Sequence, residues 1–146
     1  MAHTQQLCTF YLDNLLFGVE VEKVQEVIRY QEITRVPLAC RVVRGLINLR
    51  GQIVTALDLR RRLELEERPA GQLPMNVVVR SDDGAISLLV DEIGDVIEIA
   101  EDTFERPPET LKGVARELIR GAHKLKDRLL LILDTAKTVQ LATELH

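Results

Sequence analysis

Two segments of this 146-residue chain occur twice in the same order, and this repetition limits the folds open to it. Residues 21–28 align with residues 90–97, and residues 45–58 align with residues 121–134. In the first pair Val21, Val27 and Ile28 match Val90, Val96 and Ile97. The second pair shares its first glycine and its last aspartate. Because both matches keep their order, internal duplication is favoured over chance similarity between valine-rich segments.

The repeated segments have the pattern of short strands joined by turns. Asp13-Asn14 and residues 81–84 are hairpin turns, and Gly51-Gln52 is interpreted as a type II′ turn. Asp58 and Asp134 are candidate caps for a short helix reaching Leu65 and for a C-terminal helix. The strands expected around these signals are residues 10–12, 16–21, 24–28, 46–50, 53–57, 77–80, 85–90, 96–99 and 129–133.

Taken together, the pattern predicts a mainly β chain with two similar small barrels or curled sheets. The first is expected over residues 7–68, and the second, with the C-terminal helix, over residues 74–146. The turn-rich residues 69–74 would join them. Neither half has enough sequence to bury a sufficient core alone, so the two are expected to pack together and form a groove at their seam.

Composition excludes several classes of function. The net charge is -4 and aromatic residues make up 3%, which argues against nucleic-acid binding. No apolar run is long enough to cross a bilayer, and no signal peptide is evident, so a cytoplasmic location is expected. The run Arg60, Arg61 and Arg62 is interpreted as a solvated helix face, since Glu64, Glu66 and Glu67 follow it.

No constellation of reactive groups points to an enzyme. The serines, Ser81 and Ser87, have no nucleophile-elbow context, and the cysteines, Cys8 and Cys40, stand apart from any metal-ligand spacing. No phosphate-binding loop is present. We therefore expect no catalysis, no metal and no cofactor. A small-molecule-binding β module stays open as an alternative, although it would need a polar constellation inside the groove.

Features of protein recognition remain. Arg50 lies at a hairpin tip, where arginine is a common interface anchor, and Val24, Glu26 and Val27 place apolar groups beside an acid. Arg50 could equally be a solvated turn residue, and both valines could equally be core.

At these residues the chain resembles the CheW family of chemosensory coupling proteins. Residues 45–54 (GLINLRGQIV) and 57–60 (LDLR) look like the family signature, and residues 17–21, 23–27, 34–37 and 89–96 match its order and spacing. The resemblance covers nearly the whole chain, as a single domain over residues 1–146.

The resemblance implies two packed five-stranded SH3-like β-barrels and an adaptor without catalytic activity. Its partners would be the cytoplasmic hairpin tip of a chemoreceptor and the regulatory domain of the histidine kinase CheA. A coupler of a gliding or pilus pathway is the alternative output. Carried over by position, Val24, Glu26, Val27 and Arg50 would contact the receptor, and Gly45, Gly51, Met75 and Val96 would shape or line the groove.

Overall fold

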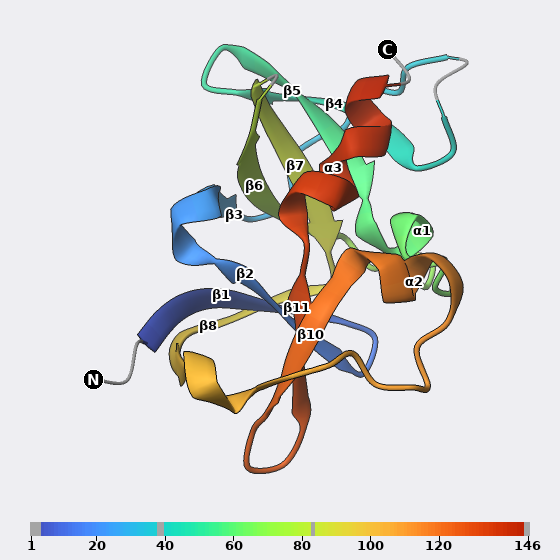
Figure 1. Ribbon diagram of the computed structural model, residues 1–146. Coiled ribbons are helices and arrows are strands. Elements are labelled where there is room, and N and C mark those ends of the chain that lie inside the picture. Colours follow the sequence, from blue (N-terminus) through green and yellow to red (C-terminus); the bar gives the residue numbers. More distant parts are fainter. Residues whose placement is uncertain (1–3, 38–39, 83, 145–146) are drawn as a thin grey trace.

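The computed structural model describes residues 4–37, 40–82 and 84–144, and its strands form two sheets (Figure 1). The six-stranded sheet has the order β8 (Glu92–Ala100), β1 (Thr4–Leu12), β2 (Leu15–Glu20), β11 (Leu129–Leu133), β10 (Ile119–Lys124) and β9 (Phe104–Glu105). The five-stranded sheet has the order β3 (Val24–Ile28), β6 (Met75–Ser81), β7 (Gly84–Val90), β5 (Gln52–Asp58) and β4 (Val43–Leu49). The predicted mainly β fold class is confirmed, with the two-residue β9 as an additional strand.

The two sheets repeat one strand order, which supports the duplication inferred from the sequence. The order β3-β6-β7-β5-β4 corresponds to β8-β1-β2-β11-β10. In each sheet the first two strands are antiparallel, the third and fourth are parallel, and the fourth and fifth form a hairpin. The aligned segments 21–28 and 90–97 cover β3 and most of β8, which are equivalent strands, and segments 45–58 and 121–134 cover most of the two equivalent hairpins.

The sheets do not, however, divide the chain at the predicted boundary of residues 69–74. The hairpin β1–β2 joins the strands of the C-terminal half, and the hairpin β6–β7 joins β3, β4 and β5. The first hairpin of each half is thus part of the sheet that is formed mainly by strands of the other half. The physical reason lies in the parallel pairs that β2 forms with β11 and β7 forms with β5. Two strands joined by a short turn can only pair antiparallel, so each parallel partner has to come from a distant part of the chain.

Short helices follow β5, precede β10 and follow β11. They are α1 (Leu59–Arg62), α2 (Gly113–Leu118) and α3 (Thr135–Glu144), with 3₁₀ turns η1 (Val21–Lys23) and η2 (Glu101–Thr103). The predicted caps are confirmed: Asp58 accepts from the Arg61 amide and Asp134 accepts from the Lys137 amide at 3.0 Å. α1 ends at Arg62, earlier than predicted, and α2 was not predicted. Figure 1 shows α3 leaving β11 and lying against the five-stranded sheet, where it contacts β5 and β6.

Three apolar clusters form the core. One belongs to the five-stranded sheet and includes Ile47 and Val54, and another belongs to the six-stranded sheet and includes Leu7 and Leu130. The largest is shared, and it packs Leu57 and Leu88 with residues of both sheets, including Phe10 and Phe17, whose rings stack 5.7 Å apart. This shared cluster holds the sheets together, as expected for halves too small to be stable alone.

Candidate protein-binding site

The structure brings together two of the four residues predicted to bind a partner. Arg50 Nη1 donates to Glu26 Oε2 at 2.9 Å, and this ion pair connects the β4–β5 hairpin to β3. β3 and β4 are the outermost strands of the five-stranded sheet, and a backbone bridge from Thr34 to Leu46 also spans the gap between them. The sheet is therefore curled so that its two edges approach each other, with the ion pair at one end.

The position of Arg50 is fixed by a tight turn. The predicted turn Gly51-Gln52 is one residue out of place: Leu49 pairs with Gln52, so the turn residues are Arg50 and Gly51. Their φ angles are 55° and 88°, positive at both positions as in a type I′ turn rather than type II′. Asn48 Oδ1 accepts from the Gly51 amide at 2.8 Å and braces the turn. The role of Asn48 was missed, although asparagine side chains often hydrogen-bond the backbone of a nearby turn.

The side chains around the pair differ in exposure. Glu26 has 18% of its side chain exposed and Arg50 has 78%, and Glu26 Oε1 is buried without a hydrogen-bond partner among the described residues. Val27 is exposed, whereas Val24 is half-buried against the shared core cluster. The site therefore combines an exposed valine, a largely buried acid and an exposed arginine.

Gly45 has a structural reason to be glycine. Its φ is 151°, and a Cβ there would lie 2.2 Å from the carbonyl oxygen of Thr34. That oxygen accepts from the Leu46 amide at 2.8 Å, so the backbone of residues 33–34 cannot move away without losing the bridge. Gly45 thus permits the close approach that curls the five-stranded sheet.

The other residues predicted to shape the groove lie apart from one another. Gly51 belongs to the turn that carries Arg50, and nothing lies within 4 Å of where its Cβ would be. Met75 begins β6 and packs against the shared cluster. Val96 lies on β8 of the other sheet and is 58% exposed.

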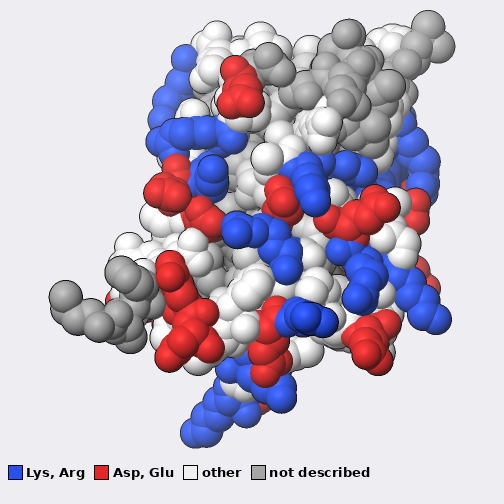
Figure 2. Space-filling model, in the orientation of Figure 1, with Lys and Arg blue, Asp and Glu red and all other residues white. Residues whose placement is uncertain are grey.

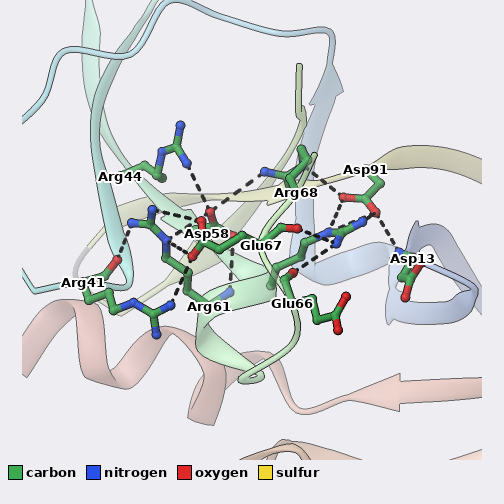
Figure 3. A network of polar contacts seen from close by, with 10 residues as sticks. Asp13, Arg41, Arg44, Asp58, Arg61, Glu66, Glu67, Arg68 and Asp91 are labelled. Atoms are coloured by element: carbon green, nitrogen blue, oxygen red, sulfur yellow. Dashed lines mark hydrogen bonds and ion pairs between the residues drawn. The ribbon is translucent and has the colours of Figure 1, made fainter. Parts of the chain in front are cut away.

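A network of buried charges, which the sequence did not reveal, joins α1 and the segment after it, residues 63–74, to Asp91 between β7 and β8 (Figure 3). Asp91 is 7% exposed, and it accepts from Arg60 Nε at 3.0 Å and again from Arg60 Nη2. It also accepts from Arg68 Nε at 3.0 Å and from the Asp13 amide at 2.7 Å. Burial alone would raise the pKa of Asp91, but the hydrogen bonds, led by those from Arg60, hold it below its usual value.

The predicted solvated face over residues 60–62 is therefore wrong. Arg60 is 6% exposed and pairs with Asp91, while Arg62 Nε donates to the Thr138 carbonyl oxygen at 2.9 Å and ties α1 to α3. Arg61 makes a two-pronged contact with Glu67, at 2.9 and 3.2 Å. The hydrogen bond from Arg61 lowers the pKa of the Glu67 carboxyl. The alternation of charges along the sequence cannot show that Arg60 pairs with the distant Asp91 instead of facing solvent.

On the face shown in Figure 2, basic and acidic side chains are interspersed and neither sign forms a continuous field. Within the described ranges, no three His, Cys, Asp or Glu side chains are placed to hold a metal ion. No helix in the described part of the chain is long and apolar enough to cross a membrane.

Comparison with known proteins identifies the family. Residues 6–143 match the CheW-like domain. The chain is 29% identical over 136 residues to the chemotaxis protein CheW of Treponema pallidum, an alignment covering 90% of this chain and 80% of that protein. It is 30% identical over 130 residues to CheW of Bacillus subtilis, covering 89% and 83% of the two chains. The crystal structure of the scaffolding protein TtCheW from Thermoanaerobacter tengcongensis superimposes with a TM-score of 0.83 at 26% identity, covering 96% of this chain and 94% of that one. With a matching fold and nearly full-length sequence similarity, the chain belongs to the family of CheW-like domains.

Proposed function

We propose that the protein is a non-catalytic adaptor of a bacterial chemosensory system, working in the cytoplasm. It couples the cytoplasmic tips of chemoreceptors to the histidine kinase CheA. Membership of the CheW-like family, with relatives named as chemotaxis and scaffolding proteins, is the observation that carries this proposal.

The receptor surface is assigned to Val24, Glu26, Val27 and Arg50. A chemoreceptor tip is a helical hairpin, and such a helix is recognised by apolar contacts flanked by polar anchors. The exposed Val27 provides an apolar contact, and the Arg50 guanidinium, paired on one side with Glu26, keeps donors free for a partner. Gly45 permits the close approach that curls the sheet, Gly51 belongs to the turn that carries Arg50, and Met75 and Val96 are assigned as outer lining residues.

The kinase is proposed to bind elsewhere on the molecule through its own CheW-like regulatory domain. The two sheets repeat one strand order, so the protein has two related surfaces, one on each sheet. A partner domain with the same fold can bind either surface in a similar orientation. Linking several modest contacts raises the stability of the assembly without a new strong contact. Kinase activity would then be set by the geometry that the adaptor imposes.

The test is reconstitution of the protein with a receptor cytoplasmic fragment and the cognate kinase, followed by autophosphorylation. Wild-type protein should raise the receptor-dependent rate, and Arg50→Gln should lower that stimulation while kinase binding persists. Arg106→Gln, at an exposed arginine on the loop before α2, is the matched control and should behave as wild type. A wild-type protein that forms no complex and changes no rate would exclude the adaptor role. Full stimulation by Arg50→Gln would exclude only the receptor surface.

A further inference from the structure

A pocket of about 250 Å³ lies beside β4 and α1, at a distance from the proposed receptor surface. Four arginines line it: Arg35, Arg41, Arg44 and Arg61. Arg44 and Arg50 stand near opposite ends of β4, so their Cα atoms are about 20 Å apart at the usual rise of a strand. The pocket can therefore be altered without touching Arg50 or Glu26.

The positive charge at this pocket exceeds the negative charge available to it. Two carboxylates face the arginines. Asp58 lies 3.6 Å from Arg44, 3.7 Å from Arg61 and 3.9 Å from Arg68, all longer than a hydrogen bond. Glu67 is shared between Arg61 and Arg41. The pocket is thus locally basic, although the whole chain carries a net charge of -4.

Several donors at the pocket are left over. Arg35 is exposed and forms no ion pair or hydrogen bond with any described residue. Arg44 has no partner within hydrogen-bond distance in the described ranges. Arg68 does not line the pocket, but it lies 3.9 Å from Asp58, so that carboxylate is shared among three arginines.

The chain already shows what kind of group these arginines bind. Glu67 comes from the linker after α1, and its carboxylate meets the planar guanidinium of Arg61 with two parallel contacts (Figure 3). Arginine matches a carboxylate in this geometry, with specificity as well as strength. Arg41 reaches the same carboxylate at 3.1 Å from β4's side of the pocket. Arg35 and Arg44 could receive a second carboxylate in the same way.

We propose that this pocket is a second protein-binding site, which receives the carboxylate side chains of an acidic segment in a partner protein. Glu67 acts as a built-in competitor that holds Arg41 and Arg61 until such a segment binds. The site is separate from the receptor surface, and the proposal does not depend on the identity of the receptor.

The probe is a blocked hexapeptide with four consecutive Glu or Asp residues, titrated by NMR and calorimetry at low ionic strength. Its counterpart with Gln and Asn is the neutral control. We expect saturable binding of the acidic peptide, with shifts at Val36 and Val43 beside the pocket, and weaker binding as salt is added. The neutral peptide should not bind. Inorganic phosphate is titrated separately, because it offers the same kind of negative oxygen without a peptide.

Three variants sharpen the test. The double variant Arg35→Gln, Arg44→Gln should weaken peptide binding by about tenfold or more, because it removes the two guanidinium groups at the pocket that have no hydrogen-bonded partner among the described residues. Glu67→Gln should strengthen binding, because it removes the competitor. Arg106→Gln, at an exposed arginine outside the pocket, should leave the affinity unchanged. Arg35→Gln alone is tested in case the double variant does not fold, because Arg35 has no partner among the described residues whose loss would destabilise the protein.

The proposal is overturned if wild-type protein shows no saturable peptide binding, or if Arg106→Gln weakens it as much as the double variant does. It is also overturned if phosphate binds the pocket more tightly than the peptide, since the site would then be one for a small anion. Unchanged affinity in Glu67→Gln would overturn the competitor role.

Discussion

Arg50 and Glu26 form an ion pair 2.9 Å long that connects the turn of the β4–β5 hairpin to the edge strand β3 of the curled five-stranded sheet. The arginine is mostly exposed while the acid is mostly buried, with one carboxylate oxygen lacking any described partner. This asymmetry means that the two partners should respond differently to mutation.

Arg50→Gln should destabilise the fold by about 1 kcal/mol, because it leaves the Glu26 carboxylate largely buried without its cation. Adding Glu26→Gln to that variant should recover part of the loss, since a neutral amide costs less to bury. Urea unfolding of the two single variants and the double variant measures the coupling. Strictly additive losses would show that the pair contributes nothing to stability.

Gly45→Ala should be strongly destabilising. The new Cβ would meet the Thr34 carbonyl oxygen at 2.2 Å, and the backbone angle is unfavourable for a side chain as well. We expect a loss of about 2 kcal/mol or more in free energy of unfolding. Gly51→Ala is the matched control: it has the same type of backbone strain but open space around it, so its loss should be about 1 kcal/mol. Similar losses for both would mean that the close approach to Thr34 is unimportant.

Asp91→Asn should cost about 3 kcal/mol or more, because it leaves Arg60 and Arg68 buried with a neutral partner. The folded pKa of Asp91 lies below its unfolded value of about 3.9. Its contribution to stability is therefore present above pH 4 and is lost as the pH falls through the folded pKa. Chemical unfolding at a series of pH values should show the wild type losing stability on acidification. Asp91→Asn should show a smaller loss, and an unchanged slope would contradict the assignment.

His123 should give a separate pH dependence. Its side chain is buried beside Phe104, and burial lowers its pKa, against the opposing effect of its contact with Thr103. The neutral ring is therefore favoured in the folded state. Stability should be complete above the unfolded pKa of about 6.5 and should fall as the pH drops below it.

The hydrogen bonds around His123 indicate which nitrogen carries the proton. The Thr103 hydroxyl donates to the Ala100 carbonyl oxygen at 2.8 Å, so Nδ1 of His123, 2.8 Å from that hydroxyl oxygen, must be the donor. NMR titration of the ring in the intact protein checks both the direction of the pKa shift and the tautomer. A pKa above that of an unfolded histidine would refute the prediction. His123→Gln should remove the part of the stability loss that begins as the pH drops below about 6.5.

Local patterns in the sequence were enough to predict most of the strands, though not β9 or β10, together with both aspartate caps and the duplication. Strand 129–133 and the hairpin around residues 81–84 need only apolar runs and turn residues, and these act over a few positions. The alignment of residues 21–28 with 90–97 is confirmed by the equivalent positions of β3 and β8 at the edges of the two sheets, although Val27 and Val96 are both exposed. The position of the turn at Arg50 was predicted one residue too late, and its type was therefore wrong as well. The strand register decides the position, and it depends on how the two strands pair rather than on the turn residues alone.

Only the tertiary structure decided which strands share a sheet and which charges meet. The exchange of the hairpins β1–β2 and β6–β7 rests on parallel pairing between strands far apart in sequence, which short-range patterns do not encode. Arg60 looked like part of a solvated run, yet it is buried against Asp91, 31 residues away. The sequence by itself determined the elements and the repeat, because hydrophobic periodicity and turn chemistry are local. The ion pairs, the basic pocket and the division into sheets depended on long-range packing.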